Sequence, residues 1–174
     1  MNRERFLQPK HEKCMQTINI VIESPRATQA KYKYDPKEQI FKLKKLLPLG
    51  MVFPYDFGFI PGTAGEDGDP LDALVLSEFA GFTGAHLTCR LIGALKAKQK
   101  EEGKEAIRND RYFCVPIGSI TYGSIQSIDQ LGEEHNEQME QFFINYNKVE
   151  GKEFKVLGII NDEKAIKLIK KSKA

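Results

Sequence analysis

The sequence predicts an α+β domain built on an antiparallel sheet, and three observations support this expectation. Short segments in which one face is apolar fill the chain up to about residue 115, as strands with one buried face do. Two segments with helical spacing come late, and Gly and Pro residues separate the strands. No internal repeat or interdomain linker interrupts the 174 residues, so we expect residues 1–174 to form a single domain.

Apolar alternation predicts the strands in order. The first, at residues 18–23, ends at Ser24-Pro25 and leaves Glu23 on its wetter face. The other strands are expected at residues 31–34, 41–47, 52–60, 71–76, 87–95, 112–115 and 154–160. Between residues 96 and 111 a charged, hairpin-like segment is typical of a solvated loop.

The strand expected at residues 41–47 carries a lysine on its apolar face. With unbroken alternation, Lys45 shares that face with Phe41 and Leu43. Lys42 and Lys44 then point to the opposite face. Because a lysine on an apolar face needs an anionic partner, Lys45 is a candidate anion-binding residue. A β-bulge that turns it outward is the alternative.

Two helices are expected near the end of the chain. Apolar residues recur at steps of three and four over residues 131–146, with Ser127 and Gln130 as a capping box. Asn161 caps a last helix that ends in lysines, which suit the helix dipole. Residues 1–13 are charged and aperiodic and are expected to form a loose N-terminal arm.

Composition excludes several functional classes. The net charge is only +2, which gives no reason to expect nucleic acid as a partner. Cys14, Cys89 and Cys114 are odd in number and lack CxxC spacing, so neither disulfides nor a zinc site are indicated. No signal peptide or membrane-length apolar segment is found, and we expect a cytoplasmic protein without a membrane partner.

Three aspartates between residues 67 and 72 form the most informative pattern. Asp67, Asp69 and Asp72 repel one another, and Pro70 excludes a helix that could separate them. Oxygen ligands without Cys or His suit Mg²⁺, Mn²⁺ or Ca²⁺. An EF-hand does not fit, since Asp72 stands where its loop needs glycine. A solvated turn is the alternative, but three acids favour a metal site.

The segment Asp67-Gly68-Asp69-Pro70-Leu71-Asp72-Ala73 resembles the signature of the soluble, magnesium-dependent inorganic pyrophosphatases. Segments that resemble other landmarks of the family occur in the family's order, at residues 21–25, 31–32, 54–60 and 142–146. The resemblance implies a five-stranded OB-like antiparallel β-barrel flanked by helices. It also implies pyrophosphate as substrate, Mg²⁺ as cofactor with Mn²⁺ as an alternative, and a homo-oligomer, with a hexamer favoured.

The resemblance further implies roles for single residues. Asp67, Asp69 and Asp72 hold the metals, Asp69 is the general base for the attacking water, and Glu23 joins the metal shell through waters. The phosphate-binding residues that it implies are Lys31, Lys45, Arg111, Tyr146 and Lys148. Lys31, Lys45 and Tyr146 also count as catalytic. In the family's second acidic segment, between residues 96 and 111, Asp110 is the favoured metal ligand, ahead of Glu101 and Glu102.

The chain departs from the family's pattern at several site positions. Phe53 and Phe57 stand where tyrosines are usual, and Lys33 stands where an acid is common. Asn147 replaces a lysine, and Lys45 an arginine, which removes a bidentate fork. These departures leave open the number of metals and two other functions. One is hydrolysis of another phosphoanhydride, and the other is a non-enzymatic OB-type binding module.

Overall fold

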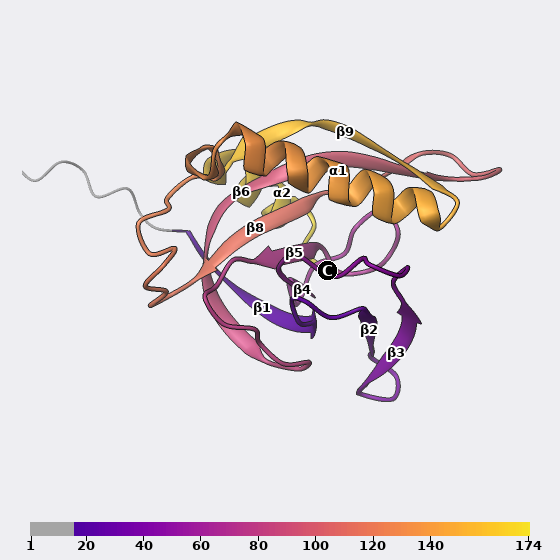
Figure 1. Ribbon diagram of the computed structural model, residues 1–174, viewed down its shortest axis with the longest axis horizontal. Helices are drawn as coiled ribbons and strands as arrows, with labels where there is room; N and C mark the ends of the chain where they lie inside the picture. The colour runs from indigo at the N-terminus through magenta and orange to yellow at the C-terminus, as the bar shows by residue number, and fades with distance from the viewer. Residues whose placement is uncertain (1–15) are drawn as a thin grey trace, which may run out of the picture.

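The computed structural model describes residues 16–174 (Figure 1). The arm expected at residues 1–13 lies outside the described residues, as does Cys14. The strands are β1 (Thr17–Ser24), β2 (Ala30–Asp35), β3 (Ile40–Leu46), β4 (Asp56–Phe59), β5 (Asp72–Val75), β6 (His86–Glu101), β7 (Ile107–Arg108), β8 (Arg111–Pro116) and β9 (Lys152–Asn161). The helices are the 3₁₀ turn η1 (Ile128–Leu131), α1 (Glu133–Val149) and α2 (Asp162–Lys171).

Five strands close into a barrel. They pair in the order β1-β4-β5-β8-β6, and an additional β1–β6 pairing closes the ring. β7 and β9 extend the sheet from β6 outside this ring. The predicted OB-like barrel is therefore confirmed. One pair within it, β5–β8, is parallel rather than antiparallel.

The two helices cover the barrel over separate apolar clusters. Neighbouring residues of β5 alternate between these clusters, because successive side chains of a strand point to opposite faces. Leu74 packs in the cluster that includes Phe143 of α1, whereas Ala73 packs in the one that includes Ile169 of α2. α1 and β9 lie side by side along one side of the molecule (Figure 1).

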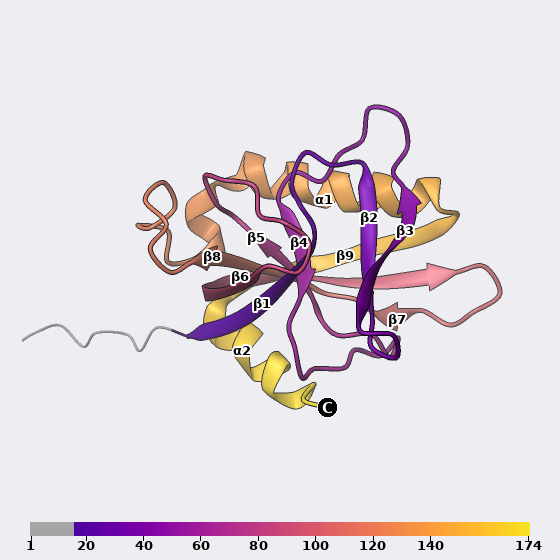
Figure 2. The same cartoon turned by 90° about the horizontal axis from the view of Figure 1, so that it is seen from below.

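The β2–β3 hairpin is a separate two-stranded sheet beside the barrel (Figure 2). The apolar face predicted for the strand at residues 41–47 is only partly buried, since Leu47 is buried but Leu43 is exposed. The hairpin also contains a bulge. Lys31 pairs with Lys45, but the next residue, Tyr32, pairs with Leu43, so Lys44 is an extra residue on β3.

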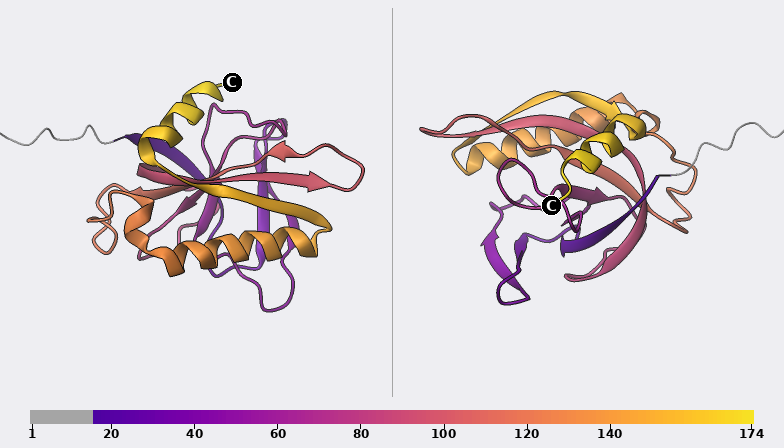
Figure 3. Two further views of the ribbon diagram at one scale, coloured as in Figure 1. Left: turned by 90° about the horizontal axis from the view of Figure 1, so that it is seen from above. Right: turned by 180° about the vertical axis from the view of Figure 1, so that it is seen from behind.

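Other boundaries shift for local reasons. β6 runs far beyond the predicted end at residue 95 and forms, with β7, a long arm that projects from the barrel (Figure 3). A bulge between Leu91 and Gly93 moves Leu95 to the opposite cluster from Leu91. The capping box of Ser127 and Gln130 forms, but it caps η1, and α1 begins only after Gly132.

The end of the chain fastens the loop that precedes the aspartates. Ala64 N–H donates to the Ser172 carbonyl at 2.7 Å, and Ala174 N–H donates to the Gly62 carbonyl at 3.1 Å. The predicted cap forms as well, because the Asn161 side chain accepts from Lys164 N–H. The residues that follow α2 thus hold the loop at residues 62–64 in place. Within residues 16–174, no helix has the length and apolar character needed to span a bilayer.

Candidate active site

The acid loop, residues 65–72, connects the loop held by α2 to strand β5. Gly65 N–H donates to the Asp69 carbonyl at 2.7 Å, and Gly68 N–H donates to the Gly65 carbonyl at 3.1 Å. Gly68 has φ +81, a conformation that favours glycine. These bonds fold the loop tightly, so its backbone sets where the aspartates lie.

The loop acids lie close enough to influence one another. Asp67 Oδ1 accepts from Asp69 N–H at 3.1 Å. Desolvation, together with the charges of Asp72 and Asp69, raises the pKa of Asp67. The loop therefore concentrates negative charge, as the sequence predicts.

Two cationic side chains meet the loop from different elements. Lys33 on β2 places its Nζ 2.5 Å from Asp69 Oδ2. Arg111, buried at the start of β8, places Nη1 2.7 Å from Asp72 Oδ2. Two of the three loop aspartates are thus paired with cations that belong to the chain itself.

Lys31, Lys45 and Tyr146 come together where the hairpin meets α1. Lys31 Nζ donates to Tyr146 Oη at 2.7 Å, and Lys45 Nζ lies 4.7 Å from the centre of the Tyr146 ring. Lys45 also forms an ion pair with Glu150 at the end of α1. Burial and the charges of Lys31, Lys44 and Lys152 lower the pKa of Lys45 to about 7.

Lys44 was expected to face away from the site, and this is wrong. Because it is the extra residue of the bulge, it turns to the same side as Lys45. Desolvation and the charges of Lys33 and Lys31 lower the pKa of Lys44, while Asp69 opposes this shift. The hairpin thus presents four lysines, Lys31, Lys33, Lys44 and Lys45, beside the acid loop.

The phenyl ring of Phe57 links the two groups of cations. Lys31 Nζ lies 5.4 Å from its centre, and the guanidinium carbon of Arg111 lies 6.0 Å from it. Phe53 stacks on Phe57 with ring centres 5.3 Å apart, and both rings are buried. The floor between the cations is therefore apolar and offers no hydroxyl at these two positions.

Glu23 was expected on the wetter face of its strand, but only 8% of it is exposed. An irregularity in the β1–β4 pairing between Ile22 and Ser24 turns it inward, where Oε1 accepts from Tyr34 N–H at 2.8 Å. Burial, and to a smaller extent the charge of Asp72, raise the pKa of Glu23 to about 7. Glu23 is thus electrostatically coupled to the acid loop.

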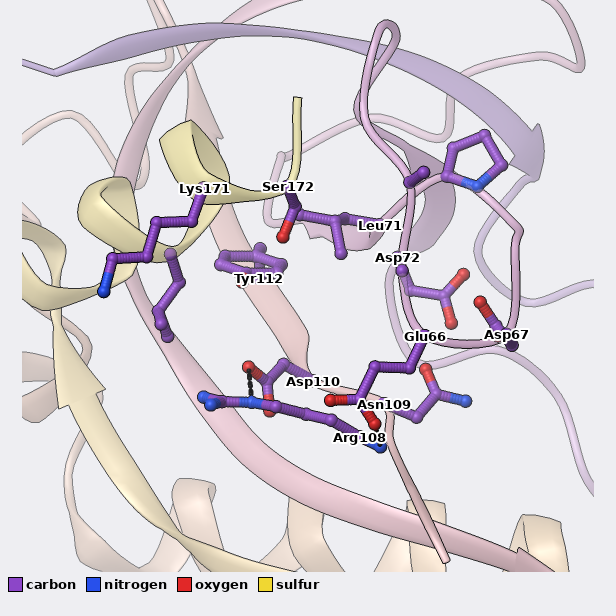
Figure 4. Close-up of a pocket in the computed structure, with 14 residues that line it drawn as sticks. Glu66, Asp67, Leu71, Asp72, Arg108, Asn109, Asp110, Tyr112, Lys171 and Ser172 are labelled. Atoms are coloured by element: carbon purple, nitrogen blue, oxygen red, sulfur yellow. Dashed lines mark hydrogen bonds and ion pairs between the residues drawn. The ribbon is translucent and has the colours of Figure 1, made fainter. Parts of the chain in front are cut away.

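Asp110 is held by structural contacts. It is 6% exposed, Oδ1 accepts from Ala97 N–H at 3.1 Å, and Oδ2 pairs with Arg108 Nε at 2.8 Å. A cavity of about 290 Å³ lies between the acid loop, residues 108–110 and the end of α2. In Figure 4, Asp110 and Arg108 contact each other on one side of this cavity, and Asp67 and Asp72 lie on another. These contacts favour a structural role for Asp110, and we expect this role in place of the metal binding predicted from the sequence, which no observation tests.

Asn147 and Lys148, neighbours near the end of α1, differ in burial. Asn147 is buried and its Nδ2 donates to the Phe143 carbonyl at 2.8 Å, so its amide serves α1 itself. Lys148 is exposed near the end of α1. On the β6 arm, Glu101 pairs with Lys104 and Lys152, away from the acid loop.

The oxygen donors of the acid loop can be compared with what a divalent metal ion needs. Across residues 16–174, no three His, Cys, Asp or Glu side chains gather closely enough to hold an ion as they stand. Asp69 and Asp72 contact Lys33 and Arg111 instead of an ion. Each uses one carboxylate oxygen in that contact, and the other oxygen remains to coordinate an ion. Carboxylates alone suit a hard divalent cation, so the donor set fits such a metal.

Sequence reasoning missed several residues at the site. Glu150 and Arg108 gave no signal, because their partners, Lys45 and Asp110, are set by tertiary contacts. Glu66 was not singled out in the sequence, although its Oε2 accepts from Arg108 N–H at 2.7 Å and braces the loop. Lys44 was missed because its orientation depends on the bulge in the hairpin, and this bulge has no clear signature in the sequence.

Comparisons with known proteins agree on one family. The profile of the inorganic pyrophosphatases matches residues 20–174. The inorganic pyrophosphatase of Synechocystis sp. is 35% identical over 141 residues, 81% of this chain and 80% of that protein. The crystal structure of the Thermus thermophilus inorganic pyrophosphatase has a TM-score of 0.82 and 31% identity, covering 95% of this chain and 94% of that one. The Helicobacter pylori pyrophosphatase structure has a TM-score of 0.81 and 29% identity, covering 93% and 96%.

The closed barrel, with an acidic loop beside a cationic hairpin, defines an α+β enzyme with an OB-like fold. Within that class, the chain belongs to the inorganic pyrophosphatase family, whose reaction is hydrolysis of inorganic pyrophosphate. Membership of this family also implies a divalent metal cofactor.

Proposed function

We propose that this chain hydrolyses inorganic pyrophosphate to two orthophosphates with Mg²⁺, or alternatively Mn²⁺, held by Asp67, Asp69 and Asp72. Glu23, coupled to the loop but buried, joins the metal shell through water. The observation that carries the proposal is the meeting of the acid loop with the lysine hairpin, where Lys33 and Asp69 are 2.5 Å apart. Metals and a phosphate anion need these opposite charges side by side.

The reaction is limited by charge, since water must approach a group that already carries several negative charges. Bound divalent ions lower the pKa of a coordinated water and neutralise phosphate charge. Asp69 accepts the proton of the attacking water, because the tight backbone of the loop fixes the position of this residue at the centre of the acids. This arrangement keeps the base in place without help from the substrate.

The cations of the opposite side bind the substrate. Lys31 and Tyr146 share a hydrogen bond and together offer N–H and O–H donors to one phosphoryl group. Lys45 joins them after leaving Glu150, and Arg111 contributes from the side of Asp72. Lys148 is exposed close to these groups in sequence and completes the set in the bound state.

A phosphate-release assay tests the proposal. Purified protein is incubated with pyrophosphate and Mg²⁺ or Mn²⁺, with and without EDTA, and orthophosphate is measured. We expect release that requires metal and that EDTA abolishes. A panel of nucleoside triphosphates and tripolyphosphate serves as comparison, and a preference for any of these over pyrophosphate would assign the site to another phosphoanhydride.

We also propose a cytoplasmic homo-oligomer, with a hexamer favoured. Support comes from an exposed apolar patch on two loops, which contains Phe79, Phe82, Ile117 and Ile120. Glu78 ties these loops together, because its carboxylate accepts from Ser119 and Ile120. Exposed apolar side chains that gather on neighbouring loops favour association. Light scattering on the eluting protein measures the assembly, and a monomer at micromolar concentration would contradict it.

A further inference from the structure

Lys33 is the cation nearest to the acid loop. Its Nζ lies 2.5 Å from Asp69 Oδ2, and about a third of its side chain is exposed, 37% against 49% for Asp69. The backbone of Lys33 pairs with Lys42 on β3, yet the two side chains diverge. Lys42 contacts Asp35 and Glu38 at the far end of the hairpin. Lys33 alone of this pair therefore crosses to the acid loop.

A fixed ammonium group at this place opposes metal binding in two ways. It occupies one oxygen of the Asp69 carboxylate, so a metal can use only the other, and it repels any divalent ion bound to the same carboxylate. Lys44, the extra residue of the bulge, adds a further positive charge on the same side. The local charge on the acid loop is thereby partly neutralised before any metal binds.

We propose that Lys33 is a built-in cation that occupies Asp69 and weakens divalent-metal binding by the substrate-free protein. The proposal rests on the proposed function of the acid loop as the metal site. In consequence, metal at Asp69 binds tightly only when the negative charge of pyrophosphate draws Lys33 away from this carboxylate. Lys33 is then a residue that determines metal affinity and contacts phosphate in the bound complex.

The test measures Mn²⁺ binding to the full-length protein by calorimetry, without substrate. Lys33→Met keeps most of the stem and removes the charge. We expect it to bind Mn²⁺ about tenfold more tightly than the wild type. Lys33→Arg keeps the charge and should retain the wild-type affinity. Lys42→Met, the matched control on the opposite strand, should also bind Mn²⁺ as the wild type does.

Two results would overturn the proposal. One is an unchanged Mn²⁺ affinity in Lys33→Met, and the other is equal tightening in Lys33→Met and Lys33→Arg, which would assign the effect to packing. Thermal unfolding monitors the fold of each variant, and Lys33→Gln replaces Lys33→Met if that protein does not fold. Phosphate release is measured separately, so absent hydrolysis with tightened Mn²⁺ binding refutes the proposed function and supports this role of Lys33.

Discussion

The two sides of the site are built differently. The acid loop is a short, continuous segment whose aspartates are fixed by their own backbone, with Asp69 N–H bonded to Asp67 and Gly65 N–H bonded to the Asp69 carbonyl. The cationic side is assembled from β2, β3, β8 and α1. Its groups are positioned by long-range contacts such as the one between Lys31 and Tyr146.

This difference suggests that the acid loop carries out the chemistry and that the cationic side binds the substrate. The backbone of the loop sets where its aspartates lie, which suits groups that coordinate ions and accept a proton. Cations on the hairpin exchange one anionic partner for another, since Lys33 and Lys45 already contact carboxylates. We therefore expect loop variants to lose turnover and hairpin variants mainly to lose substrate affinity.

The largest effect is expected at Asp69. In Asp69→Asn the amide keeps the shape but cannot accept the proton of the attacking water, so kcat should fall about 10²–10⁴-fold. The measurement is steady-state phosphate release at saturating Mg²⁺. Asp129→Asn, an exposed acid of η1, serves as the control and should keep its kcat. Near-normal turnover of Asp69→Asn would remove Asp69 from the role of base.

A smaller effect is expected on the hairpin side. Lys31→Met removes a charge-assisted donor next to Tyr146, and kcat/KM for pyrophosphate should fall about 10–100-fold, mostly through KM. Lys167→Met on α2, an exposed lysine, is the matched control. If Lys31→Met lowers kcat with KM unchanged, Lys31 acts in the transition state, and the proposed division between the two sides fails.

The same comparison explains how much the sequence could predict. The acid loop was predictable because Asp67, Asp69 and Asp72 are neighbours and need no tertiary information to be brought together. The barrel was predictable from alternation and family resemblance. The environment of Glu23 and the direction of Lys44 were not, since each depends on one irregular pairing between strands. The partners of Asp110 and Lys45 also come from folding alone.

The burial of Glu23 makes stability depend on pH in the metal-free protein. Its pKa is raised from 4.5 to about 7, so the folded state favours the protonated form. The stability that this protonated carboxyl contributes is fully present below pH 4.5 and is lost as the pH rises through 7. Glu23→Gln keeps the acceptor for Tyr34 N–H and removes the charge.

We therefore expect Glu23→Gln to be more stable than the wild type by about 2 kcal/mol at pH 8 in EDTA, with a small difference at pH 5. Urea unfolding at both pH values measures this, with exposed Glu137→Gln as the control. Adding Mg²⁺ should reverse the order at pH 8, because only the wild type retains the carboxylate. A pH-independent difference would show that the charge of Glu23 is not the cause.

The smallest effect on catalysis is expected at Asp110, which lies behind the loop rather than in it. Asp110→Asn keeps an oxygen for Ala97 N–H and loses the charge that pairs with Arg108. The Arg108 side chain is 31% exposed but Asp110 is buried, so the loss of stability should be about 1–3 kcal/mol. The concentration of Mg²⁺ that gives half-maximal activity should not move. Arg108→Met breaks the same pair from the other side. It should also leave the Mg²⁺ dependence unmoved, but it should cost more stability, because it leaves the buried Asp110 carboxylate without its cation. A shift of the Mg²⁺ activation curve in Asp110→Asn but not in Arg108→Met would instead make Asp110 a metal ligand, and the metal site would then extend from the acid loop into the cavity.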